Sequence, residues 1–194
     1  MELHSLLAQH PGTPAIEELL LKAAGEGDKS QGSPVPPPTI KIYSDAVYYS
    51  YLPLGISLNY RPSKALVPPH LGAKNNVPAP DSSLLTLEAI HLYKSPADKF
   101  ETFPLRFRVF KEGDNNSPGT ASELHINMKA HEIVQLLGEP EEKQGGGRGG
   151  NCWIGYQKSL GLAIDFAGSN WEDRDMVISC ATLSVPLMRD AGQK

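Results

Sequence analysis

The hydrophobic positions near the start of the chain follow a helical period. After Thr13-Pro14, apolar residues recur three and four positions apart until Gly25. This spacing predicts an amphipathic helix that begins at Pro14, where a missing N–H has no cost, and ends at Gly25. A second helix is expected from a cap at Asn127 to Gly138, with Pro140 beyond it. The two apolar stripes consist of Ile16, Leu19, Leu20, Ala23 and Ala24, and of Ala130, Ile133, Val134 and Leu137.

Seven other segments are rich in β-branched and aromatic residues, and several alternate apolar with polar side chains, a period of two that indicates strands. Prolines, glycines and asparagines separate them, as turns and loops require. Residues 61–86 hold five prolines and predict a long loop, and residues 141–150 predict a charged, glycine-rich one. The predicted strands are 47–51 (VYYSY), 54–60 (LGISLNY), 87–93 (LEAIHLY), 103–110, 152–156 (CWIGY), 160–166 (LGLAIDF) and 177–185.

The same order of elements occurs twice along the chain. LGISLNY at 54–60 is followed 106 positions later by the similar LGLAIDF at 160–166. In the same way, VYYSY corresponds to CWIGY, and AIHLY corresponds to ATLSV. Within these pairs Tyr51 matches Tyr156, and Tyr48 matches Trp153. A repeat that keeps its core pattern while its loops vary in length indicates a structural duplication.

We therefore expect an α+β fold built from two tandem repeats, each a helix with an antiparallel meander. One helix on a small meander encloses its apolar face poorly, so the two copies should form one sheet with both helices on one face. The expected division is a first repeat at 1–111, a linker at 112–126, a second repeat at 127–186 and a tail at 187–194. The opposite face of the sheet would then present Tyr48 and Trp153, or their neighbours, as a shallow aromatic surface.

The repeated motifs resemble known families. A helix ending in LLGEP, followed by the hairpin with LGLAIDF, is similar to the repeat of β-lactamase inhibitory protein and of the small lipoprotein of the bacterial outer-membrane assembly machinery. YYSYLPLGISLNY, AIHLY and EIVQLLGEPEEK more closely resemble the C-terminal half of the eukaryotic phagophore assembly factor family. That resemblance implies a role in autophagy through protein partners and membrane recruitment, without catalytic residues.

Composition narrows the class of protein. The net charge of −4 and the pI near 5.9 argue against a nucleic-acid binder, which carries a basic footprint. No apolar run approaches the length of a membrane span, and the N-terminal residues do not resemble a secretory signal. Only two cysteines occur, Cys152 and Cys180, which are expected to be buried thiols, although pairing across strands is an alternative. We expect a cytoplasmic protein.

No motif indicates a cofactor, a metal or a catalytic constellation. GGGRGG at 145–150 satisfies the spacing of a dinucleotide fingerprint, but a helix precedes it and a strand follows, the reverse of the required context. His125 and His131 lack a third ligand nearby in the sequence. The acidic turn around Trp171 has no EF-hand spacing and is interpreted as a solvated turn that also suits a partner contact.

These observations favour a non-catalytic protein–protein interaction module linked to autophagy or membrane trafficking. Its candidate contacts are Tyr48, Trp153, Trp171, Arg106 and Arg108. One alternative is an enzyme or small-ligand-binding protein with a site between the repeats, built from His91, His125, Asp165 or Cys152. Another is a peripheral membrane or phosphoinositide binder that uses the predicted strand at 103–110. Its basic residues are Arg106 and Arg108, for which the simpler interpretation is a charged edge strand.

Overall fold

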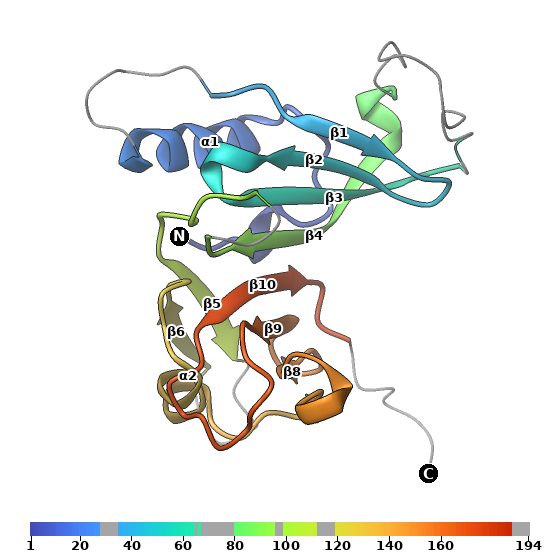
Figure 1. The fold of residues 1–194 in the computed structure, drawn as a ribbon. Helices are drawn as coiled ribbons and strands as arrows, with labels where there is room; N and C mark the ends of the chain where they lie inside the picture. The colour runs from blue at the N-terminus through green and yellow to red at the C-terminus, as the bar shows by residue number, and fades with distance from the viewer. Residues whose placement is uncertain (28–34, 65, 67–79, 96–98, 112–118, 188–194) are drawn as a thin grey trace.

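The computed structural model describes residues 1–27, 35–64, 66, 80–95, 99–111 and 119–187. Its main feature is an eight-stranded sheet in which every pair of neighbours is antiparallel (Figure 1). The α+β class and the large antiparallel sheet are therefore confirmed. In spatial order the strands are β1 (Thr39–Ile42), β2 (Val47–Tyr51), β3 (Ile56–Pro62), β4 (Leu85–Tyr93), β10 (Ile178–Ser184), β9 (Leu162–Phe166), β8 (Trp153–Tyr156) and β7 (Glu142–Gln144).

The centre of the sheet joins the two parts of the chain. β4 pairs with β10, so that Leu92 lies opposite Ala181 and His91 opposite Thr182. β1 to β3 extend the sheet on one side of this junction, and β9 to β7 extend it on the other (Figure 1). Strands far apart in sequence thus share one continuous sheet.

Two helices pack on the apolar face of the sheet. α1 (Pro14–Gly27) contributes Ile16 and Leu19 to the core, and α2 (Ala130–Leu137) contributes Ile133. α1 begins at Pro14 as expected but continues two residues past Gly25. α2 begins three residues after the predicted cap at Asn127, because the Glu132 carboxylate accepts a hydrogen bond from the backbone N–H of Lys129 instead.

A separate hairpin, β5 (Phe107–Lys111) with β6 (Thr120–Leu124), adds Phe107, Val109 and Leu124 to the same core. The strand predicted at 103–110 is therefore wrong in its first four residues, whose apolar side chains are buried without forming a ladder. β6 lies inside the segment 112–126, which was assigned to a linker. The structure describes only residues 119–126 of that segment, and residues 188–194 of the tail predicted at 187–194 lie outside the described residues.

Two predicted loops carry more structure than expected. The segment 141–150 contains β7 and a 3₁₀ turn at Gly147–Gly149. In the segment 61–86, β3 runs through Pro62, and β4 starts at Leu85 after a 3₁₀ turn at Ser82–Leu84. Residues 65 and 67–79 of that loop lie outside the described residues. Two further 3₁₀ turns occupy His4–Leu6 and Leu52–Leu54.

Candidate functional site on the open face of the sheet

Alternation along the strands separates two faces of the sheet. One face carries the buried apolar side chains that contact α1, α2 and the β5–β6 hairpin. The register assigns the intervening positions to the other side, which we call the open face. The open face consists of Tyr48, Ser50, Ser57, Asn59, Ala89, His91, Tyr93, Cys180, Thr182, Ser184, Ala163, Asp165, Trp153 and Gly155.

Tyr48 and Trp153 both lie on the open face, at opposite ends of it. Tyr48 is on β2 and Trp153 on β8, with β3, β4, β10 and β9 between them. Each is partly exposed. A Cβ placed on Gly155 would lie 3.0 Å from Cζ3 of Trp153, so the indole ring lies across Gly155. The Tyr48 ring packs edge-on against Tyr43, with ring centroids 5.8 Å apart.

Small and polar side chains cross the sheet between these two aromatic residues. In one row of the register, Ser50, Ser57, His91, Thr182, Ala163 and Gly155 lie side by side on successive strands. The hydroxyls of Ser50 and Ser57 are 2.9 Å apart, and His91 Nδ1 is 3.0 Å from Thr182 Oγ1. Apart from His91 the side chains of this row are small, and Ser57 is buried among its neighbours.

Two polar atoms of the open face have no hydrogen-bond partner among the described residues. They are Nε2 of His91 and Oδ1 of Asn59. The Tyr48 ring lies 6.1 Å from the His91 imidazole and is directly opposite Asn59 in the register. Burial lowers the pKa of His91 and therefore favours its neutral form. Because buried polar groups are normally paired, these two atoms indicate a place where a further hydrogen bond is favourable.

The residues of the enzymatic alternative do not come together. Cys152 precedes Trp153 and lies in the core on the opposite face, where burial raises the pKa of its thiol. His125 follows β6, away from the open face. Asp165 is on the open face, and its neighbours withdraw it partly from water and raise its pKa, but it is not opposite His91. Neither of the two cavities described for this fold is lined by any of the four.

The two cysteines lie on opposite faces of the sheet, Cys152 in the core and Cys180 on the open face, so they do not face each other. Among the described residues, no three histidine, cysteine or acidic side chains gather closely enough to hold a metal ion. Neither described helix has the length and apolar character that crossing a bilayer requires.

Trp171 is separate from the open face. It lies in the turn between β9 and β10, and its Nε1 donates a hydrogen bond to the backbone oxygen of Gly145, 3.1 Å away. A Cβ on Gly146 would lie 2.8 Å from the indole, so the ring packs directly on the glycine-rich segment. The glycines at 145–150 thus give the tryptophan a close backbone support, a role that their spacing alone did not reveal.

Arg106 and Arg108 lie at the β5–β6 hairpin with exposed side chains. Arg106 is 3.8 Å from the carboxylate of Glu123, which lies opposite Arg108 in the register. The backbone of Arg108 bonds to Met1 and forms a bridge with Glu2, so β5 is partly covered by the N-terminal residues. Acidic groups therefore share this surface with the two arginines.

The open-face residues that sequence reasoning missed are Asn59, Ser57, Ser50 and Thr182. Ser57 and Asn59 are the polar positions of LGISLNY, whose alternation predicts a strand with one apolar face but assigns no role to the polar side chains. Comparison of the chain with protein-family models, with curated proteins and with solved structures finds no match. The resemblance to the phagophore assembly factor family therefore stays a prediction.

Proposed function

We propose that this protein is a non-catalytic protein-binding module that holds its partner on the open face of the sheet. The observation that carries the proposal is the placement of Tyr48 and Trp153, both partly exposed, at opposite ends of one face of the sheet. Tyrosine and tryptophan are enriched among the residues that contribute most to binding energy at protein interfaces. Both rings are held by packing, which lowers the entropy that binding would cost.

The row of small and polar side chains between Tyr48 and Trp153 would determine which partners bind. A partner that approaches the small residue Ala163 meets no large side chain at that position, and the neighbouring Gly155 is covered by the Trp153 ring. Nε2 of His91 and Oδ1 of Asn59 are buried near the Tyr48 ring and lack partners within the described residues, so side-chain movement on binding has to expose them. A donor and an acceptor from the partner would satisfy both atoms, and a partner lacking them would leave them unpaired.

Structural duplication is part of the proposal. The spatial order of β1 to β4 is mirrored by β10 to β7, and each group follows one helix in the chain. Gly55 and Gly161, the matching glycines of LGISLNY and LGLAIDF, both adopt left-handed conformations, with φ of 64° and 59°. The backbone oxygen of each accepts a hydrogen bond at 2.8 Å, from Tyr93 N and Ser184 N respectively. These correspondences support two repeats that make one broad binding face.

Paired substitutions test the binding face. Tyr48→Ala with Trp153→Ala removes both aromatic anchors, and Phe110→Ala, which removes an exposed aromatic ring from β5 away from the open face, is the matched control. Affinity purification from eukaryotic cells, read by mass spectrometry, should yield partners that the wild type and the control retain and the double variant loses. Thermal unfolding confirms that all three proteins are folded. An identical set of partners with a folded double variant would refute the proposed face.

From the resemblance to the phagophore assembly factor family, we propose that such a partner acts in autophagy or membrane trafficking. Under this part of the proposal, the proteins lost from the double variant belong to autophagy or membrane trafficking. Recovery of specific partners from unrelated processes would remove the cellular assignment and leave the binding face intact.

A further inference from the structure

A cavity of about 510 Å³ lies on the helix side of the sheet, away from the open face. This volume is within the range of sites that hold small molecules. α2 forms one wall with Val134, and the turn after β9 forms another with Trp171. The floor is apolar and consists of Ile154, Phe166 and Met176, all buried.

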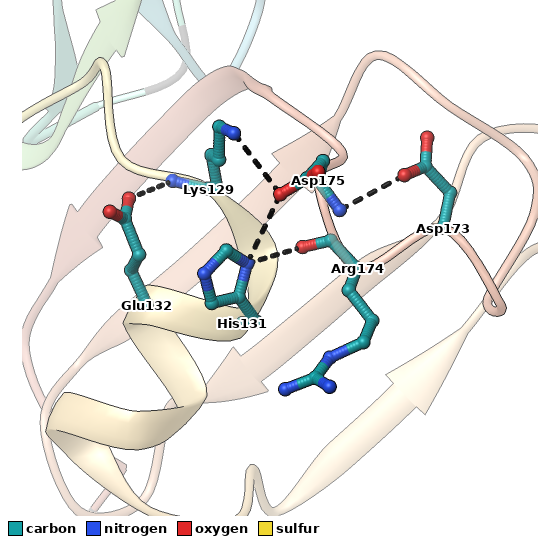
Figure 2. A network of polar contacts seen from close by, with 6 residues as sticks. All are labelled: Lys129, His131, Glu132, Asp173, Arg174 and Asp175. Carbon is teal, nitrogen blue, oxygen red and sulfur yellow. Dashed lines mark hydrogen bonds and ion pairs between the residues drawn. The ribbon is translucent and has the colours of Figure 1, made fainter.

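The polar rim of the cavity is organised by the network in Figure 2. Asp175 Oδ1 accepts from Lys129 Nζ at 3.1 Å and lies 3.5 Å from His131 Nδ1. His131 Nδ1 is also 2.8 Å from the backbone oxygen of Arg174. These contacts join the start of α2 to the turn before β10, and they occupy the Asp175 carboxylate.

Asp173, the acidic residue that lines the cavity, is also engaged. Its Oδ1 accepts from the backbone N–H of Asp175 at 2.9 Å. Figure 2 shows the Arg174 side chain extending away from the carboxylates of both Asp173 and Asp175. Among the described residues, no carboxylate lies within ion-pair distance of the Arg174 guanidinium. Arg174 therefore offers unused hydrogen-bond donors at the rim.

A second cation lies beside the tryptophan wall. Lys143 Nζ is 5.9 Å from the centre of the Trp171 ring and lines the cavity from β7. Its ion pair with Glu139 is long, at 3.8 Å, and both side chains are more than half exposed. Exposed pairs of this kind contribute little, so Lys143 remains available to another anion.

We propose that this cavity binds a small amphiphilic carboxylate. The aliphatic tail occupies the apolar floor, and the carboxylate lies at the rim, where Arg174 and Lys143 supply positive charge. Guanidinium groups bind carboxylates through two parallel hydrogen bonds, and Trp171 adds an apolar wall. The charge at the rim favours an anion over a neutral or cationic head of the same length.

Three ligands with the same eight-carbon tail test the proposal on the full chain: octanoate, 1-octanol and octylammonium. Isothermal titration should give saturable one-site binding of octanoate, weaker binding of 1-octanol and the weakest binding of octylammonium. In a Trp153→Phe variant the remaining tryptophan is Trp171, so its fluorescence should change with octanoate over the same concentration range. Absence of saturable octanoate binding, or equal binding of octanoate and octylammonium, would overturn the proposal.

Substitutions then locate the site. Arg174→Gln should weaken octanoate binding about tenfold and leave 1-octanol unchanged, because a charge-assisted hydrogen bond is lost. Arg148→Gln, which removes a positive charge from an exposed residue that does not line the cavity, should bind octanoate as the wild type does. Val134→Phe should block both ligands. If that variant fails to fold, the two arginine variants decide, and equal octanoate affinities for them would refute the site.

Discussion

Gly161 makes the sharpest test of why the fold needs its repeated glycines. It lies between β8 and β9 with φ of 59°, a left-handed conformation that disfavours side chains. A Cβ at this position would lie 2.0 Å from the backbone oxygen of Ser184, which is not a possible contact. Gly161→Ala must therefore displace the end of β10, the strand that joins the two parts of the sheet.

The expected loss of stability follows from three contributions. The left-handed conformation costs alanine about 1 kcal/mol or slightly more. Moving Ser184 weakens the hydrogen bond from its N–H to the oxygen of Gly161, now 2.8 Å long, which contributes about 1 kcal/mol. Displacing a packed strand end adds at least about 1 kcal/mol, as overpacking does in cores. We expect Gly161→Ala to lower the free energy of unfolding by about 3 kcal/mol or more.

Gly12 provides the matched control, because it shares the backbone conformation without the crowding. Its φ is 75°, and a Cβ would meet nothing within 4 Å. Gly12→Ala should therefore cost only the conformational contribution, about 1 kcal/mol, reduced further by the smaller entropy of the unfolded alanine chain. Urea unfolding of the wild type and both variants, followed by circular dichroism, measures the two losses.

The matching glycine extends the test to the other half of the chain. A Cβ on Gly55 would lie 2.4 Å from the oxygen of Glu101 and from the nitrogen of Phe103. Gly55→Ala should consequently destabilise the protein about as much as Gly161→Ala. Equal losses for Gly161→Ala and Gly12→Ala would refute the claim that close backbone approach, rather than φ alone, requires glycine here.

Three further outcomes are expected. Tyr156→Phe should cost about 1 kcal/mol by urea unfolding, because the hydroxyl donates to the backbone oxygen of Gly138 at 2.8 Å. Burial lowers the pKa of His91 below its ordinary value of 6.5, so the free energy of unfolding should be highest above pH 6.5 and fall as the pH drops from 6.5 through the lower pKa of the folded state. His91→Gln should make this pH dependence less steep. An unchanged dependence of stability on pH in that variant would contradict the expected role of His91. Gly155→Val should displace the Trp153 ring, shift its fluorescence and weaken partner capture, whereas unchanged fluorescence would exclude the described packing.

The helices and most strands of the sheet were accessible from the sequence because their buried faces are strongly apolar. β4 is an example: LEAIHLY places Leu87, Ile90 and Leu92 in the core, and the predicted strand differs from the observed one by two residues at its start. β1 and β7 were missed because they are short, largely exposed edge strands without an apolar face. They form because their backbones pair with β2 and β8, an effect that no local pattern reports.

Phe103 and Leu105 show the opposite error. Both are buried and alternate with polar residues, so the segment was predicted as part of a strand. The structure buries them beside the sheet without a ladder, and β5 begins only at Phe107. Alternating burial therefore identified the core residues correctly but not the backbone pairing, because the same side-chain pattern suits a strand and an irregular covering segment.

The candidate site, like the fold, was only partly predictable from the sequence. The sequence identified Tyr48, Trp153 and Trp171 as exposed aromatic candidates but could not relate them to one another. The register assigns Tyr48 and Trp153 to one face, and the hydrogen bond from Trp171 to Gly145 holds the third on the side of the cavity. That Nε2 of His91 and Oδ1 of Asn59 have no partner among the described residues depends on their neighbours in the fold, which the sequence does not reveal.

By itself, the sequence determined the two helices, most strands of the large sheet and which side of each of those strands is apolar, because these properties depend on local spacing. Only the tertiary structure decided that β4 pairs with β10, since that contact joins residues about ninety positions apart and depends on the whole core. The same pairing decided which polar side chains share the open face. LGLAIDF and LGISLNY carry the strands, and the backbone contacts of Gly161 and Gly55 hold those strands in place.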